Sequence, residues 1–154
     1  MNELLECLST RGLTCATAES CTGGLVAACI TETAGISKVF LGGAVTYTNE
    51  MKRRLLGVNI ETLEHFSAVS PQTAAEMAAG IRSRTGADIG VSVTGNAGPQ
   101  ASEGKPVGMV FVGIDSPWHS VVTEMQLSGS REDIRCAAAT EALKQIVLTA
   151  RQKP

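Results

Sequence analysis

Residues 17–24 constrain the fold of this chain most, because they join a short apolar strand to a helix through a polar corner. Residues 13–18 are mostly apolar and tolerate β-structure, and residues 21–33 continue as a hydrophobic helical segment. A strand followed at once by a helix is typical of α/β folds, in which helices cover a sheet. Because two glycines end the corner, its backbone can turn tightly. We therefore expect a sheet with this corner at the end of one strand.

The rest of the chain alternates helices and short apolar strands. Further helices are predicted over residues 2–11, 49–57, 60–66, 71–85 and 130–150, and further strands over residues 39–47, 87–93, 107–114 and 120–127. Since only a short turn joins the last two strands, they must be antiparallel, so the sheet is mixed. Gly42-Gly43 predicts a bulge or a close backbone approach in the strand over 39–47. The prediction is one α/β domain over residues 1–154, a helix/mixed-sheet/helix sandwich of three layers.

The overall charge limits the kinds of partner. The 154 residues carry a net charge of −2, which excludes a general attraction to nucleic acid or to an anionic membrane. No apolar run approaches the roughly 20 residues of a membrane span, and the acidic N-terminus lacks the basic region of a signal peptide. The five cysteines form no CxxC pair, which argues against a zinc site and a disulfide framework and indicates a cytoplasmic protein.

Unusual polar residues gather in three loops, over residues 19–24, 47–52 and 94–99. Each of these loops follows a predicted strand. In open α/β sheets, ligands bind beyond the carboxyl ends of the strands. We therefore expect the three loops to converge on one site.

Ser20 is a candidate nucleophile at the first of these loops, and a serine needs a base for that role. Lys52 is the better candidate base, because partial burial and the first turn of a helix capped by Asn49 both lower the pKa of an amine. Tyr47 could hold the amine or relay a proton. The alternatives are that Ser20 only caps a helix and that Lys52 belongs to a solvated charged face. The two histidines, His65 and His119, lie away from the predicted strand-end loops.

Other residues of these loops and of the last helix have two possible roles each. The segment 94–98 contains Gly95 and Gly98, and it could form an anion-binding nest or a plain turn; it matches neither the dinucleotide fingerprint nor a P-loop. Arg131 and Arg135 lie one helical turn apart and could grip a phosphate or pair with nearby acids. Cys21 is either a rival nucleophile or a small residue packed inward.

Several motifs in order along nearly the whole chain resemble the CinA family, in its stand-alone C-terminal-domain form, the nicotinamide mononucleotide deamidases. The motifs are Thr17-Ala18-Glu19-Ser20-Cys21-Thr22-Gly23-Gly24, residues 42–49 (GGAVTYTN) with Lys52, Ala68-Val69-Ser70, residues 77–82 (MAAGIR), Gly86-Ala87-Asp88, Thr94-Gly95 with Ala97-Gly98-Pro99, Lys105-Pro106-Val107-Gly108, and Arg131 with Ile134-Arg135. The first two are highly specific.

The resemblance implies hydrolysis of nicotinamide mononucleotide to nicotinic acid mononucleotide and ammonia, without metal or cofactor. It implies Ser20 as nucleophile, Lys52 as its base and Tyr47 in support, with Arg135 near the substrate phosphate. By ordinary acyl-transfer logic, amide groups at the corner would stabilise the oxyanion. The expected substrate-binding residues are Thr94, Arg135, Arg131, Cys21, Thr22, Gly23, Gly24, Asn49, Gly95 and Gly98. The implied partner is a pyridine nucleotide, with no nucleic acid and no membrane.

The chain departs from the family pattern at three places. Residues 100–104 lack the usual Gly-Gly pair, Asn96 replaces an apolar residue, and Ser67 replaces a glycine. The alternative function is therefore that of a nucleotide-binding or interaction protein that keeps the fold without deamidase activity. Ammonia release from nicotinamide mononucleotide separates the two. The alanine-rich helices at 74–81 and 136–142 suit close helix packing, and we expect a homodimer.

Overall fold

A computed structural model describes residues 2–154, so Met1 lies outside the described residues. The strands are β1 (Cys15–Glu19), β2 (Phe40–Val45), β3 (Ile89–Gly95), β4 (Met109–Asp115) and β5 (Ser120–Gln126). They form one sheet in the order β2-β1-β3-β4-β5. β1 is parallel to β2 and to β3, whereas β4 is antiparallel to β3 and to β5. The predicted mixed sheet is confirmed.

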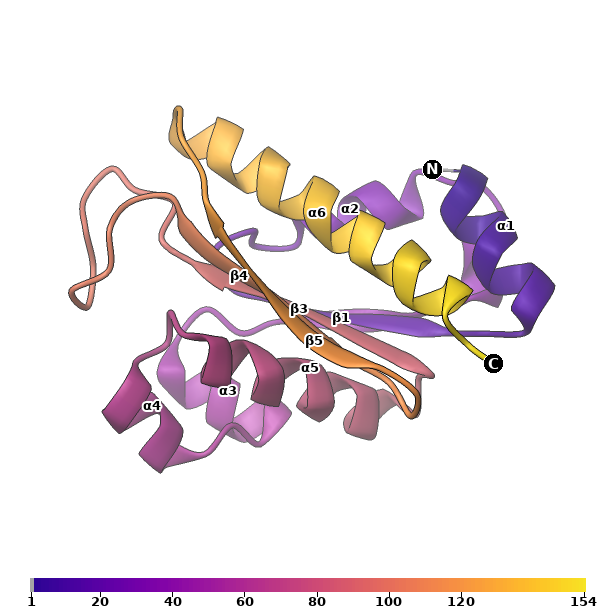
Figure 1. Cartoon of the computed structure of the whole chain (residues 1–154), viewed down its shortest axis with the longest axis horizontal. Coiled ribbons are helices and arrows are strands. Elements are labelled where there is room, and N and C mark those ends of the chain that lie inside the picture. Colours follow the sequence, from indigo (N-terminus) through magenta and orange to yellow (C-terminus); the bar gives the residue numbers. More distant parts are fainter. Residues whose placement is uncertain (1) are drawn as a thin grey trace.

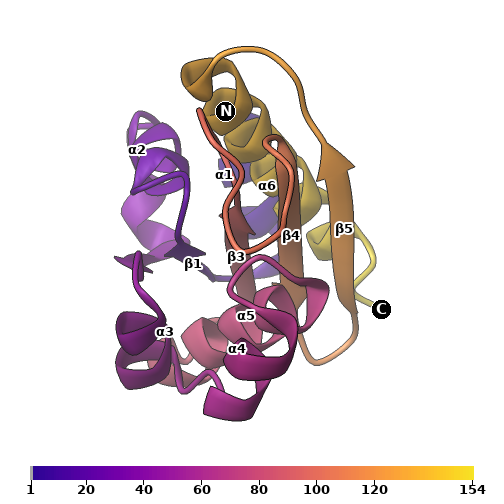
Figure 2. The same ribbon diagram turned by 90° about the vertical axis from the view of Figure 1, so that its left-hand side faces the viewer.

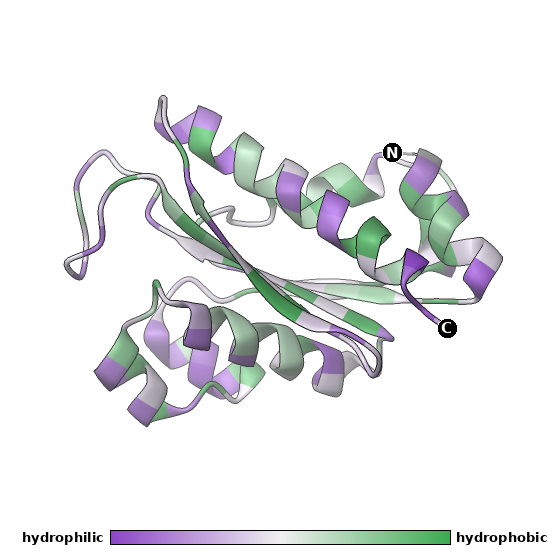
Figure 3. Ribbon diagram, viewed as in Figure 1, coloured by the Kyte–Doolittle hydropathy of each residue, from purple (hydrophilic) through white to green (hydrophobic). Residues whose placement is uncertain are grey.

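Helices cover both faces of this sheet, which confirms the predicted three layers (Figures 1 and 2). One face carries α1 (Asn2–Arg11), α2 (Leu25–Thr31) and α6 (Arg131–Arg151), and the other α3 (Asn49–Leu56), α4 (Ile60–Phe66) and α5 (Pro71–Thr85). A short 3-10 turn, Ile36–Lys38, precedes β2. Hydrophobic and hydrophilic residues alternate along the helices, as expected of elements with one face on a sheet (Figure 3). Within residues 2–154, no helix combines the length and apolar character that a membrane crossing requires.

The position of each strand in the sheet explains its sequence. β1 and all but the last residue of β3 are buried, whereas the edge strand β2 alternates half-buried and exposed residues. The glycine pair of β2 has both predicted effects. The register shifts by one residue before Gly42, and a Cβ atom at Gly43 would lie 2.0 Å from the Thr17 hydroxyl oxygen. The close approach of these two strands therefore requires glycine at position 43.

Three predicted boundaries were wrong near the loops. The helix predicted over residues 21–33 begins only at Leu25, because Gly23 and Gly24 adopt the left-handed conformation with φ of 60° and 103°. The strand predicted to end at residue 47 ends at Val45. Thr48, and not Asn49, caps α3, and its hydroxyl oxygen accepts the Met51 amide at 3.2 Å.

The two longest helices begin as predicted. Ser70 caps α5 by accepting the Thr73 amide, and Pro71 occupies the first helical position. α6 begins with a complete capping box between Ser130 and Asp133. Because these capping signals depend on residues only three positions apart, the sequence alone predicts them.

Five alanines of α5 and α6 pack inside the chain. Ala74 and Ala78 on α5, and Ala138, Ala139 and Ala142 on α6, are at most 2% exposed. These five alanines therefore hold the two helices close to the protein's own core, whereas Ala75, Ala79 and Ala137 are exposed. The homodimer stays a prediction, which a measurement of mass in solution can check.

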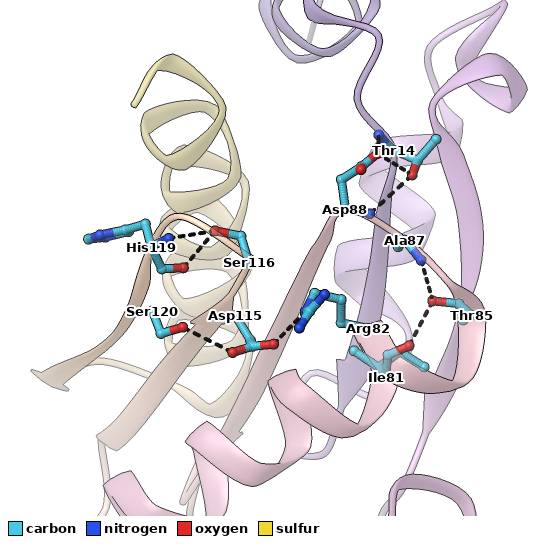
Figure 4. A network of polar contacts seen from close by, with 10 residues as sticks. All are labelled: Thr14, Ile81, Arg82, Thr85, Ala87, Asp88, Asp115, Ser116, His119 and Ser120. Carbon is cyan, nitrogen blue, oxygen red and sulfur yellow. Dashed lines mark hydrogen bonds and ion pairs between the residues drawn. The ribbon is translucent and has the colours of Figure 1, made fainter. Parts of the chain in front are cut away.

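A polar network ties together the edge of the sheet at which the parallel strands begin (Figure 4). The Asp88 carboxylate at the start of β3 accepts the Thr14 amide and hydroxyl at 2.8 and 2.9 Å. Arg82 of α5 pairs with Asp115 at the end of β4. His119 lies in the adjoining β4–β5 turn. This histidine is therefore at the opposite end of the sheet from the loops that follow β1, β2 and β3.

Ser67 ends α4 in a conformation that glycine adopts far more readily, with φ of 70° and ψ of 172°. We expect Ser67→Gly to raise the free energy of unfolding by roughly 1 kcal/mol, because relief of a strain of about 1–3 kcal/mol outweighs the greater entropy of an unfolded glycine. Urea denaturation measures this. The control is Ser83→Gly at an exposed position inside α5, which should lower stability by about 0.5 kcal/mol. A loss at both positions would contradict the strain argument.

Candidate active site

The loops that follow β1, β2 and β3 converge on a cleft of about 850 Å³, as the sequence predicts. That size suits a small molecule. The cleft is lined by Ser20, Cys21, Tyr47, Thr48, Asn49, Glu50, Lys52, Ala68, Val69, Arg131 and residues 94–103. Nine of the thirteen residues proposed from the sequence therefore lie on one surface. The other four, Thr22, Gly23, Gly24 and Arg135, are not among the lining residues.

Ser20 is the first residue after β1, and the sheet fixes its backbone. Its amide donates to the Val93 carbonyl of β3 at 2.9 Å, and its carbonyl accepts the Gly23 amide at 3.0 Å. The side chain lines the cleft although the residue is only 8% exposed. The serine hydroxyl is thus held at the floor of the cleft.

Lys52 lies in the first turn of α3 and is 1% exposed. Its Nζ donates to the Ser20 hydroxyl oxygen at 2.9 Å and to the Thr46 carbonyl at 2.8 Å. Among the described residues, it forms no ion pair with a carboxylate. The solvated charged face considered for Lys52 is therefore wrong, although Arg53 and Arg54 beside it are exposed.

Burial lowers the pKa of Lys52 from 10.5 to about 8, because desolvation penalises the ammonium form. Cys21 and Glu103 partly oppose this shift. At pH 7 about a tenth of the molecules then carries a neutral amine at hydrogen-bond distance from Ser20. This is the protonation state that a general base requires.

The Tyr47 hydroxyl bonds to Arg131 and not to Lys52, whose amine it was expected to hold. Tyr47 is 59% exposed, and its hydroxyl oxygen accepts Nη2 of Arg131 at 3.0 Å. Arg131 also donates Nη1 to the Gly98 carbonyl at 2.5 Å. Arg131 therefore joins the loop after β2 to the loop after β3 at the side of the cleft, and Tyr47 supports the arginine where the sequence predicts support of Lys52.

Arg131 lines the cleft, whereas Arg135 does not. The Nε of Arg135 donates to the Cys21 carbonyl at 3.1 Å and its Nη2 to the Thr22 carbonyl at 2.8 Å. These bonds fasten the corner after Ser20 to α6. The expected arginine pair is thus divided between the cleft wall and the corner.

The loop after β3 is organised by Asn96, which is 8% exposed. Its side-chain amide nitrogen donates to the carbonyls of Gln100 and Lys105, and its side-chain oxygen accepts the Gly98 amide. Thr94 lies at the base of this loop and donates to the Ala68 carbonyl at 2.7 Å. The polar residue at position 96 therefore holds the loop that lacks the Gly-Gly pair.

Residues 102–105 of this loop form a tight turn over the cleft. Glu103 and Gly104 both have positive φ, at 53° and 71°, and Ser102 and Lys105 exchange backbone hydrogen bonds. The Glu103 carboxylate accepts the Ala68 amide at 3.0 Å. A carboxylate thus lines the cleft at a position that sequence reasoning did not select.

Cys21 packs against the hydrophobic core and is 6% exposed. Burial raises the pKa of its thiol to about 11, so the nucleophilic thiolate is scarce at neutral pH. Of the two roles considered for Cys21, the structure supports the small residue packed inward and not the rival nucleophile. Of the two histidines, neither lines the cleft.

Glu19 is the main residue that the sequence analysis missed. It is 1% exposed, and its carboxylate accepts the amides of Gly24, Val26 and Ala27. An acid placed directly before a polar corner and a helix was the available signal. Because Glu19 and Ser20 accept the amides of Gly24 and Gly23, these two groups are not free for an oxyanion.

Comparison with known proteins agrees with this architecture. The CinA C-terminal domain family matches residues 1–149. The chain is 52% identical over 137 residues to a CinA-like protein of Kosmotoga olearia, covering 88% of this chain and 33% of that protein. It is 44% identical over 153 residues to a putative competence-damage inducible protein of Bacillus subtilis, covering 99% of this chain and 37% of that protein. The chain therefore spans about a third of these curated relatives.

Solved structures show the same fold over almost the whole chain. The competence damage-inducible protein A of Klebsiella pneumoniae superposes with a TM-score of 0.95 at 35% identity, covering 99% of this chain and 96% of that one. The competence/damage inducible protein CihA of Agrobacterium tumefaciens gives 0.89 at 42% identity, covering 97% and 96%. With the family match over 149 residues, these likenesses show that the chain belongs to the CinA C-terminal domain family.

Proposed function

We propose that this protein hydrolyses the carboxamide of nicotinamide mononucleotide, giving nicotinic acid mononucleotide and ammonia. The observation that carries the proposal is the buried Lys52 amine, 2.9 Å from the Ser20 hydroxyl in a cleft of small-molecule size. A serine paired with a neutral lysine is an activated nucleophile. The choice of pyridine nucleotide comes from membership of a family known for this deamidation.

The chemistry is acyl transfer. Lys52 takes the Ser20 proton as the serine oxygen bonds to the amide carbon, which forms a tetrahedral oxyanion. Collapse of this species breaks the carbon–nitrogen bond, and the proton held by Lys52 passes to the departing nitrogen as ammonia leaves. A water molecule then attacks the acyl-serine ester with Lys52 as base, which releases the carboxylate and restores Ser20. The sum is amide plus water to carboxylate plus ammonium.

Arg131 is the proposed ligand of the substrate phosphate, because its guanidinium lines the cleft between the loops after β2 and β3. Thr94, Asn49, Gly95 and Gly98 line the same cleft and are proposed to contact the rest of the nucleotide. Arg135 is proposed to act through the corner that it holds, because its guanidinium donates hydrogen bonds to two backbone carbonyls of that corner.

The test is ammonia release from nicotinamide mononucleotide by the purified chain, with the acid product identified by chromatography. Ser20→Ala supplies the background. Turnover that vanishes in Ser20→Ala supports the proposal, whereas wild-type release no greater than that background overturns it. Nucleotide binding without turnover, measured by calorimetry, would support the alternative function. In that case the protein binds a nucleotide but lacks deamidase activity, as the altered 100–104 loop suggested.

A further inference from the structure

Glu19 links the sheet to α2 across the corner that carries Ser20. Its backbone pairs with Val45 of β2 and Val93 of β3, and its carbonyl accepts the Thr46 amide at 2.8 Å. Its carboxylate accepts the amides of Gly24 and Val26 at 3.0 Å each and of Ala27 at 2.8 Å. These amides are among the groups at the start of a helix that have no partner inside it. One residue thus fixes both ends of the turn over residues 20–24.

Arg135 binds carbonyl groups of the same turn, whereas Glu19 binds amide groups. A planar trans peptide directs its N–H and its C=O to opposite sides. Because the Cys21 carbonyl is bound to Arg135, the Thr22 amide points away from that guanidinium. The Gly23 and Leu25 amides donate to the carbonyls of Ser20 and Thr22. Residues 21–25 have five backbone amides. Those of Cys21 and Thr22 donate to no other residue in the described part of the chain.

We propose that Glu19 is the positioning residue of Ser20: by accepting the amides at the start of α2, its carboxylate fixes the turn and leaves the Cys21 amide, whose residue lines the cleft, as the amide of this turn that serves the oxyanion. This rests on the proposed function, since it takes Ser20 as the nucleophile. The buried carboxylate at the start of α2 also disfavours binding of the substrate phosphate there. Gly23 and Gly24 therefore shape the turn and do not contact substrate.

The test is Glu19→Gln, which keeps the side-chain shape but replaces one acceptor oxygen by a donor that faces amide N–H groups. We expect kcat for ammonia release to fall about 10²-fold with KM changed less than about 3-fold, because a displacement of about 1 Å at a nucleophile costs that much. The labelling rate of Ser20 by a fluorophosphonate should fall in parallel. Hydrogen exchange at the Gly24, Val26 and Ala27 amides should accelerate.

The matched control is Asp88→Asn, which removes a carboxylate that accepts a backbone amide at the opposite edge of the sheet. We expect it to lower the melting temperature without changing kcat or the labelling rate. Glu19→Asp serves as a second variant if Glu19→Gln is not folded, because the shorter acid keeps the charge and should retain part of the labelling rate.

The proposal is overturned if the three amides exchange faster in Glu19→Gln but its kcat and labelling rate equal those of Asp88→Asn. Glu19 would then act only as a helix cap. A wild-type Ser20 that does not react with the fluorophosphonate also overturns it. If the wild type reacts with the probe but releases no ammonia, the proposed substrate fails, and the labelling and exchange data still decide the role of Glu19.

Discussion

Replacing Lys52 with methionine is expected to lower kcat for amide hydrolysis by roughly 10²–10⁴-fold, the usual contribution of a general base. Methionine fills the buried site but cannot take the proton of Ser20, whose backbone is held independently by Val93 and Gly23. The wild-type rate should fall as the pH drops below about 8, where Lys52 becomes charged, and the residual rate of the variant should lose that step. Steady-state ammonia assays over pH measure both.

Two comparisons make this result specific. Arg53→Met removes the exposed neighbouring cation and should leave kcat unchanged. The double variant Ser20→Ala/Lys52→Met should be no slower than Ser20→Ala alone, because residues that act as one unit lose their effect together. A Lys52→Met protein that retains more than about a tenth of the wild-type kcat would remove Lys52 from the proposed mechanism.

The second large expected effect is on stability, and it comes from the same lysine. The pKa of Lys52 is lowered to about 8 in the folded state from 10.5 in the unfolded chain. Below pH 8 the amine is charged in both states, so the folded protein carries the full cost of burying an ammonium. Between pH 8 and 10.5 the folded state binds fewer protons than the unfolded state, so stability rises with pH. The rise should be about 3 kcal/mol.

This rise is measured as a difference between proteins. The free energy of unfolding of the wild type, minus that of Lys52→Met, should increase between pH 7.5 and 10.5 in urea titrations, because all other titrating groups cancel. Lys144→Met is the control, since the Lys144 side chain is 61% exposed and loses little solvation on folding. A difference that stays flat with pH would mean that the Lys52 ammonium is not penalised in the folded state.

The lysine therefore shows a conflict between stability and the proposed activity. A buried amine without a carboxylate partner destabilises the fold at neutral pH, yet its lowered pKa is what makes it a base. The Thr46 carbonyl and the Ser20 hydroxyl compensate only part of the lost solvation. At Ser67 the strained backbone shows no comparable link to the reacting groups, which is why we expect its relief to raise stability.

Local patterns in the sequence determine the framework of this protein. The alternation of apolar strands and helices, the Ser70-Pro71 start and the Ser130–Asp133 capping box each depend on residues a few positions apart, and all are found as predicted. The convergence of three loops also follows from the sequence, because β1, β2 and β3 are parallel and end at one edge. The resemblance to one family added the identity of the candidate residues.

Tertiary structure alone decides which of these residues meet and in what electrostatic state. Ser20 and Lys52 are 32 positions apart, so neither their 2.9 Å contact nor the burial that lowers the lysine pKa is encoded in a local pattern. Tyr47 binds Arg131, 84 positions away, where the sequence suggested Lys52. The corner at residues 20–24 is turned by two left-handed glycines and held by Glu19 and Arg135, because unpaired amides and carbonyls there must find partners that the fold supplies.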